Sequence, residues 1–286
     1  MKIAHISDTH LSDRHGFFVS NFLRVVEAVN AWAPDLVIHT GDLSINGADR
    51  ARDLTYSMEL MQRFDAPVRV LPGNHDVGEE PGFMQLNQPT TEPRLARYEA
   101  AAGPDRWAFD AGEWRMIGMN AQVLGTGLDR EAEQASWLEG ELEGAQGQQI
   151  GIFTHKPLFF PRELDDGAPR SIFMPRGVRA RLFSLFSRSG VRFVASGHLH
   201  KHLDIMAGGV RWLWAPATAY KSGLNVGVGT PALGFIRMEL NGPNLSAELS
   251  VPDGMVARKL SPLKGGADYL KDAPPYAPPD EFAAAD

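Results

Sequence analysis

Apolar positions in the first quarter of the chain follow two alternating periods. Short apolar runs at 2–7, 35–40 and 67–72 have the length and composition of buried strands. Between them, apolar residues recur at helical spacing in 17–32 and 51–64, so both segments are predicted to be helices packed on a core. The order β-α-β-α-β predicts parallel strands joined by right-handed crossovers.

The same alternation returns further along the chain and then fades. Apolar runs predict strands, and helical periodicity predicts helices: the strands lie at 106–112, 114–120, 148–155 and 191–197, and the helices at 94–101, 131–144 and 178–190. Helical period is scarce from 203 to 251, where short apolar runs predict antiparallel strands joined by tight turns. The pattern as a whole predicts an α/β fold.

The periodic pattern is not divided by an internal repeat or a linker, so residues 1–260 are predicted to form one domain. Two stretches, at about 77–105 and 156–175, interrupt the pattern and are interpreted as excursions from the core. The segment 261–286 carries Pro, Ala and Asp without period, which predicts an irregular tail.

Composition and charge restrict the function more than the fold. The 286 residues are 43% hydrophobic and 22% charged, as in ordinary globular proteins, and the net charge is −7. Such an acidic chain is not expected to bind nucleic acid, which requires a basic face. Because the chain has no cysteine, a transition-metal site must use His, Asp, Glu, Asn or backbone ligands.

The N-terminal residues show neither a long apolar stretch nor a small-residue cleavage pattern, so no signal peptide is predicted. No apolar run reaches the roughly 18 residues that a membrane-spanning helix needs. A cytoplasmic protein is therefore expected.

Polar residues gather at the C-terminal ends of five predicted strands. In open α/β sheets ligands bind at that edge, so these side chains are expected to converge. Imidazoles and carboxylates would crowd there unless cations lay between them, and seven donors exceed the shell of one four- to six-coordinate ion. A pair of divalent cations is the predicted occupant. The seven donors are Asp8, His10, Asp42, Asn74, His155, His198 and His200.

The order of these motifs resembles that of the calcineurin-like metallophosphoesterases. The family pattern D-x-H, GD, GNH[DE], H and GHxH stands here as "DTH", "GD", "GNHD", "TH" and "GHLH", within roughly the first 70% of the chain. The resemblance implies a four-layer α/β/β/α sandwich of the metallophosphoesterase type, with two packed mixed sheets flanked by helices.

The resemblance also implies how two divalent or transition metal ions (Mn, Fe, Zn or Co) would share the donors. One ion would be bound by Asp8, His10 and His200. The other would be bound by Asn74, His155 and His198, and Asp42 would bridge the pair. Two such ions would clamp a phosphoryl group and hold a hydroxide that attacks phosphorus in line.

Other histidines and one carboxylate are assigned supporting or catalytic roles. By the motif match, His75 would protonate the leaving oxygen or stabilise its charge, and Asp76 would orient that imidazole or a metal-bound histidine. His5 and His39 lie inside apolar strand runs and are interpreted as core or supporting histidines. His202 alternates with His198 and His200, but both metal shells are filled without it, so it is predicted not to be a ligand.

The sequence "THKP" at 154–157 most resembles the bacterial branch that includes cyclic-nucleotide phosphodiesterases and glycerophosphodiesterases, although Lys156 departs from its His-His-Pro-Pro pattern. The branch implies hydrolysis of a small phosphodiester or nucleotide-like substrate, with the excursions 77–105 and 156–175 at the rim of the pocket. In this branch such segments also build oligomers, so a homo-oligomer stays open as an oligomeric state. A phosphomonoesterase, a nucleotide pyrophosphatase and a metal-free protein-binding scaffold stay open as alternatives. The acidic charge disfavours a DNA nuclease.

Overall fold

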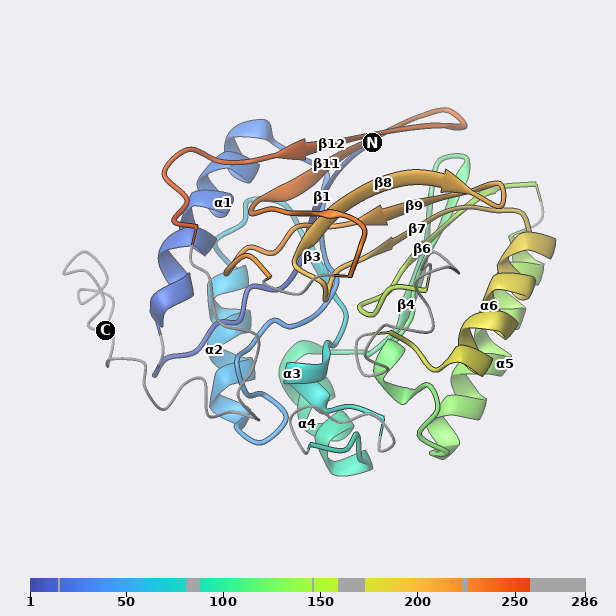
Figure 1. The fold of residues 1–286 in the computed structure, drawn as a ribbon, viewed down its shortest axis with the longest axis horizontal. Helices are drawn as coiled ribbons and strands as arrows, with labels where there is room; N and C mark the ends of the chain where they lie inside the picture. The colour runs from blue at the N-terminus through green and yellow to red at the C-terminus, as the bar shows by residue number, and fades with distance from the viewer. Residues whose placement is uncertain (15, 81–87, 146, 159–172, 223–225, 258–286) are drawn as a thin grey trace.

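Two β-sheets form the centre of the computed structural model, and helices cover their outer faces (Figure 1). The structure describes residues 1–14, 16–80, 88–145, 147–158, 173–222 and 226–257. The predicted tail 261–286 and parts of both predicted excursions lie outside these ranges.

The first sheet joins the N-terminal strands to the last two strands of the described chain, in the order β12-β11-β1-β2-β3. β1 (Lys2–Ile6), β2 (Leu36–His39) and β3 (Val68–Val70) are parallel, as the β-α-β-α-β pattern predicts. β11 (Phe235–Asn241) runs antiparallel to β1, and β12 (Asn244–Ser250) forms the edge.

The second sheet has the order β10-β8-β9-β7-β6-β5-β4. Its strands are β4 (Trp107–Ala111), β5 (Trp114–Gly118), β6 (Gln149–Phe153), β7 (Val191–Ser196), β8 (Lys201–Ala207), β9 (Val210–Trp214) and β10 (Thr230–Pro231). The antiparallel pairing expected within 203–251 is confirmed for β8 with β9 and for β11 with β12, and β9 also pairs parallel with β7. After β7 the chain first forms β8 and then returns antiparallel to it as β9, so β9 lies between β8 and β7.

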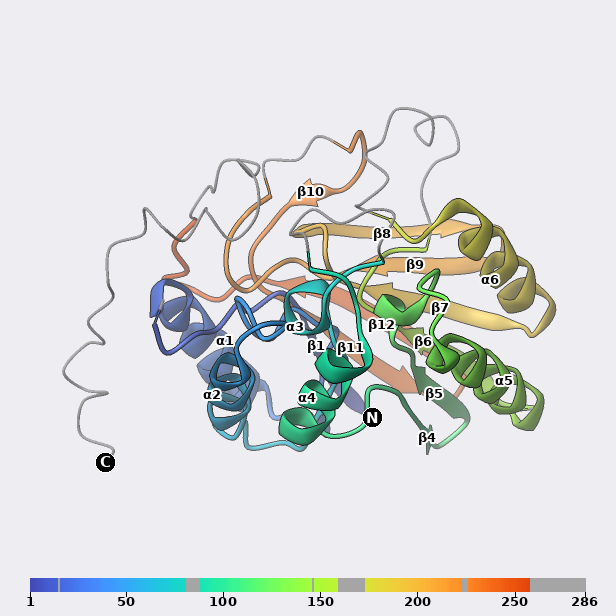
Figure 2. The same cartoon turned by 90° about the horizontal axis from the view of Figure 1, so that it is seen from below.

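Helices form the two outer layers. α1 (Val19–Trp32) and α2 (Ala51–Met61) lie on one side of the sheets, while α5 (Asp129–Gly144) and α6 (Arg176–Arg188) lie on the other (Figures 1 and 2). The short helix α3 (Asn74–Val77) and the helix α4 (Glu92–Ala102) lie between these pairs (Figure 2). Two single 3₁₀ turns, Gly16–Phe18 and Ala121–Val123, complete the described helices.

Three apolar clusters correspond to the three interfaces between the layers. One joins α1 and α2 to the first sheet, and another joins α5 and α6 to the second. The third lies between the sheets, where Trp114, Phe153 and Phe193 meet Ile236 and Met238 of β11. The predicted four-layer α/β/β/α sandwich is therefore confirmed. Within the described residues, no helix has the length and apolarity needed to cross a membrane.

Candidate metal centre

The predicted donors converge where strands of both sheets end. Asp8 and His10 follow β1, and Asp42 follows β2. Asn74 opens α3 (Asn74–Val77), a four-residue helix after β3 that is too short to show a helical period in the sequence. The remaining donors come from the second sheet: His155 follows β6, and His198 and His200 lie between β7 and β8.

The backbone at the centre is strained in a way that the sequence does not reveal. Six non-glycine residues in the described part of the chain have positive φ, and one of them, Ala33, caps the C-terminus of α1. Non-glycine residues rarely adopt this region, and such strain persists where the surrounding structure enforces it, often at functional sites. The other five residues with positive φ are Asp8 (54°), His10 (46°), Asp42 (54°), His198 (70°) and His200 (52°).

Two glycines let the loops approach closely enough to bring the donors together. A Cβ atom at Gly73 would lie 2.1 Å from Oδ1 of Asp42, and one at Gly197 would lie 1.8 Å from Oγ of Ser7. Any side chain at either position would push the neighbouring loop away. Only glycine therefore fits at these two positions.

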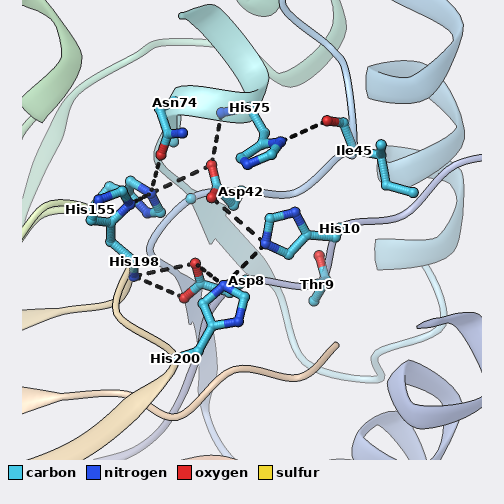
Figure 3. A network of polar contacts seen from close by, with 12 residues as sticks. Asp8, Thr9, His10, Asp42, Ile45, Asn74, His75, His155, His198 and His200 are labelled. Atoms are coloured by element: carbon cyan, nitrogen blue, oxygen red, sulfur yellow. Dashed lines mark hydrogen bonds and ion pairs between the residues drawn. The ribbon is translucent and has the colours of Figure 1, made fainter. Parts of the chain in front are cut away.

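The first group of donors is Asp8, His10 and His200, whose ligand atoms all lie within 4.8 Å of one another. Nε2 of His10 lies 3.2 Å from Nε2 of His200, which lies 3.4 Å from Oδ1 of Asp8 (Figure 3). The Asp8 carboxylate also accepts a hydrogen bond of 2.9 Å from the backbone N–H of His198, which ties the first sheet's loop to the second's.

The second group is Asn74, His155 and His198. Nε2 of His155 lies 3.2 Å from Oδ1 of Asn74 and 3.1 Å from Nδ1 of His198. Asp42 lies between the groups, with Oδ1 at 3.4 Å from Nε2 of His155 and Oδ2 at 3.7 Å from Nε2 of His10 (Figure 3). Each carboxylate oxygen of Asp42 therefore faces one group.

Backbone carbonyls fix the orientation of two of these imidazoles. Nδ1–H of His155 donates to the carbonyl of Thr40 (2.7 Å), and Nδ1–H of His200 donates to that of Tyr220 (2.9 Å). In both rings this leaves the Nε2 lone pair directed at the other donors, the arrangement found in metal-binding histidines. Lone pairs 3.1–3.4 Å apart repel one another unless a proton or a cation lies between them. The donor set therefore fits divalent cations.

Burial and charge act differently on the imidazoles and the carboxylates of the centre. Burial lowers the pKa of His10 and of His198 below the ordinary value. For His155 burial acts in the same direction, but the charge and hydrogen bond of Asp42 outweigh it and raise the pKa to about 9. Burial opposes ionisation of Asp8, yet the charge of His200 holds its pKa below the ordinary value. The charge of His155 likewise holds the pKa of Asp42 well below its ordinary value. Two ionised buried carboxylates require a cationic partner.

His75 lies beside the first group of donors. Its ring makes an edge contact with His10, with ring centroids 4.6 Å apart, and it forms a third close set with His10 and Asp42. Nδ1–H of His75 donates to the carbonyl of Ile45 (2.8 Å), so Nε2 is the atom that can exchange a proton with a bound molecule.

Asp76 has a different role from the one expected. Instead of orienting an imidazole, its carboxylate accepts hydrogen bonds from the backbone N–H groups of Leu43, Ser44 and Gly73 and from Oγ of Ser44, at 2.7–3.1 Å. It thus joins the Asp42 loop to the Asn74 loop. Burial, together with the charge of Asp42, raises the pKa of Asp76 to about 6.

His5 and His39 are buried supports, as the sequence indicates. The backbone N–H of Gly41 donates to Nδ1 of His39 (3.1 Å), so Nε2–H of that ring donates to Oγ1 of Thr9 (3.0 Å). Oγ1 of Thr9 in turn donates to the carbonyl of Leu43. The chain of hydrogen bonds fixes the first motif loop against the second.

His202 and Lys156 lie beyond the donor groups. Among the described residues, none of the three close sets of donors contains His202, which lies on β8. Lys156 is buried and pairs with the buried Glu79, with Nζ 3.5 Å from Oε1.

Comparison with known proteins points to the same family as the motifs. Residues 1–202 match the family model of the calcineurin-like phosphoesterases. The 3′,5′-cyclic adenosine monophosphate phosphodiesterase CpdA of Escherichia coli K12 is 27% identical, over 76% of each chain. The serine/threonine-protein phosphatase CPPED1 of Danio rerio is 31% identical, over 63% of this chain and 59% of its own.

Among solved structures, a dimetal phosphatase from Danio rerio has the same fold. It superposes with a TM-score of 0.59 at 14% identity, and the match covers 87% of this chain and 95% of that protein. The cyclic-nucleotide phosphodiesterase among the relatives belongs to the bacterial branch that the sequence resembles. The chain belongs to the calcineurin-like phosphoesterase family and is a metal-dependent phosphoric ester hydrolase.

Proposed function

We propose that this chain hydrolyses small-molecule phosphodiesters at a dinuclear metal centre. The observation that carries the proposal is the position of Asp42, whose two carboxylate oxygens face two separate groups of donors. Asp8, His10 and His200 would hold one ion, and Asn74, His155 and His198 the other. When bound, the two ions would neutralise the phosphoryl oxygens and lower the pKa of a water molecule.

The protein's own residues would orient the substrate and move a proton. The carbonyl of Ile45 holds the His75 ring by Nδ1–H, so Nε2 would carry the proton that the leaving oxygen receives. Asp76 would affect the reaction only by positioning Asp42, because its hydrogen bonds hold the backbone of the Asp42 loop. Phosphodiester specificity is further supported by the similarity to CpdA.

The proposal is tested with the metal-loaded protein and two substrates. Bis-p-nitrophenyl phosphate is expected to be turned over with Mn²⁺ present, faster than p-nitrophenyl phosphate. The substitution Asp42→Ala should lower kcat/KM by at least about a hundredfold and reduce the bound metal measured by elemental analysis. Asp253→Ala, which removes an exposed carboxylate, is the matched control and should change neither.

Two outcomes would contradict the proposal. Turnover of the monoester with an inert diester would favour a phosphomonoesterase, the activity named for CPPED1. A purified chain that takes up no Mn²⁺, and whose stability alone responds to Asp42→Ala, would favour a protein-binding scaffold.

A further inference from the structure

A groove with an apolar floor lies between the two helices that cover the second sheet. α5 and α6 lie side by side on the outer side of the molecule (Figures 1 and 2). The groove between them has a volume of about 930 Å³, and its floor includes the buried side chains of Met119, Leu138 and Leu182. An apolar hollow of this size in a helix layer is typical of a surface that binds another molecule.

The upper walls of the groove consist of small side chains. Ala132 and Ala135 of α5 and Ala180 and Ser184 of α6 line it, and all four are exposed. Helices pack with their axes 8–10 Å apart, and small side chains at the contact allow the closer of these distances. The groove is therefore shaped for helices of another molecule.

The two helices beside the groove carry opposite charge. α5 has six acidic residues and one arginine, whereas α6 has four arginines and no acidic residue. Across the groove Arg181 lies 4.0 Å from Glu131, but the Arg181 side chain is 75% exposed. Glu139 and Arg188 also line the groove, and neither has an ion-pair partner among the described residues. The groove therefore has an acidic side and a basic side that can each bind opposite charge.

We propose that this groove is the interface with a second copy of the chain, related to the first by a two-fold axis. Two such helix pairs can stack face to face in two ways. If α5 of each copy lies on α5 of the other, like charges meet. If α5 of each copy lies on α6 of the other, opposite charges meet at both symmetric positions and the apolar floors are buried between them. The charges select the second arrangement.

The register of the helices names the residues that would meet. α5 and α6 each lead back to one of the parallel strands β6 and β7, so they run in the same direction. Arg181 is level with Glu131. Glu139 lies about 12 Å further along α5, and Arg188 about 11 Å further along α6, so these two are level as well. A two-fold axis parallel to the helices keeps levels equal and places Glu139 of one copy opposite Arg188 of the other.

The oligomeric state is measured by sedimentation velocity of the full chain over a series of concentrations. The wild type is expected to change from the mass of one chain, 31.3 kDa, to twice that mass as its concentration rises. Ala135→Lys places a long cation in the groove and should raise the Kd of the dimer at least about tenfold. Ser136→Lys is the matched control, because Ser136 is the next residue on α5, is exposed and does not line the groove. It should keep the Kd within about twofold of the wild type.

Charge reversal tests the arrangement of the two copies. Glu139→Arg and Arg188→Glu each place like charges opposite one another twice, and each should raise the Kd about tenfold. The double variant Glu139→Arg with Arg188→Glu restores opposite charges and should return the Kd to within about threefold of the wild type. Circular dichroism should be the same for all variants. A wild type that stays a single chain at every concentration, equal effects of Ala135→Lys and Ser136→Lys, or a double variant as weak as the single ones would overturn the inference.

Discussion

At the scale of single residues, Asp76 is the carboxylate that holds the motif loops together. It accepts four hydrogen bonds, three of them from backbone N–H groups. Asparagine has one carbonyl oxygen and would turn its NH₂ group toward one of those donors. We therefore expect Asp76→Asn to lower the free energy of unfolding of the metal-free protein by about 3 kcal/mol, measured by urea titration.

The matched control for Asp76 is Asp110→Asn on β4, where the carboxylate is exposed and a change in stability is not expected. Because the Asp42 loop depends on Asp76, the Asp76→Asn protein should also bind Mn²⁺ more weakly, by about 10- to 100-fold. Unchanged stability and unchanged Mn²⁺ affinity would show that Asp76 does not position the loop.

His200 and His202 provide a second contrast between neighbouring side chains. Nε2 of His200 lies in the first group of donors, whereas His202 lies outside the close sets of the described residues. His200→Ala should therefore reduce bound Mn²⁺ and activity, and His202→Ala should leave the metal content of the purified protein unchanged. Loss of metal from His202→Ala, at wild-type stability, would add that residue to the ligands.

The positions of the seven donors could be proposed from the sequence because each follows an apolar run that forms a strand, although these strands belong to two sheets rather than one. The groups that hold these donors in place could not be predicted from the sequence. The carbonyls of Thr40, Ile45 and Tyr220 orient imidazoles, yet a carbonyl belongs to every residue type and leaves no pattern in the sequence. Positive φ at Asp8 and His10 is equally hidden, because it is imposed by contacts between loops distant in the sequence.

At the scale of elements, the buried Lys156–Glu79 pair joins two segments that lead away from the centre. Lys156 follows β6, and Glu79 follows α3. Backbone hydrogen bonds of Glu79 with Gln88 and Thr90, both 2.8 Å long, extend the connection to the segment before α4. The pair thus links the beginnings of both predicted pocket-rim excursions.

Removal of one member of this pair should lower the free energy of unfolding more than removal of both. Lys156→Met takes a buried cation away from a buried carboxylate, and we expect it to lower the free energy of unfolding by about 3 kcal/mol. The double substitution Lys156→Met with Glu79→Leu should recover most of that loss. Arg24→Met, which breaks an exposed pair with Glu27, should stay within about 0.5 kcal/mol of the wild type.

The coupling within the Lys156–Glu79 pair is measured by a double-mutant cycle in urea. Additive effects of the two substitutions would show that the pair does not connect the segments energetically. The sequence shows a lysine and a glutamate in two irregular stretches, but it does not show that they meet. Short elements cannot be predicted from the sequence either. With four residues, α3 shows no helical period, whereas the periodicity of the longer α1, α2 and α5 predicts each of them.

At the scale of the whole molecule, buried neutral histidines couple folding to pH. Burial, together with the neighbouring His39, lowers the pKa of His5 to about 3, and burial lowers that of His39 to about 3. Between roughly pH 6.5 and pH 3 the unfolded chain binds protons at these positions while the folded chain does not. Stability of the metal-free protein should therefore fall as the pH falls through this window.

The contribution of one ring is isolated by His5→Gln, which removes the titrating group. From pH 7.5 to pH 5 the variant's free energy of unfolding should fall by about 2 kcal/mol less than that of the wild type, measured by urea titration of chelator-treated protein. Thr40→Val removes the hydrogen bond between Thr40 and His5 but keeps the imidazole, so it should lower stability at both pH values and preserve the difference between them. Equal pH dependence in His5→Gln and the wild type would mean that His5 takes up a proton in the folded protein, and that its burial does not hold the ring neutral.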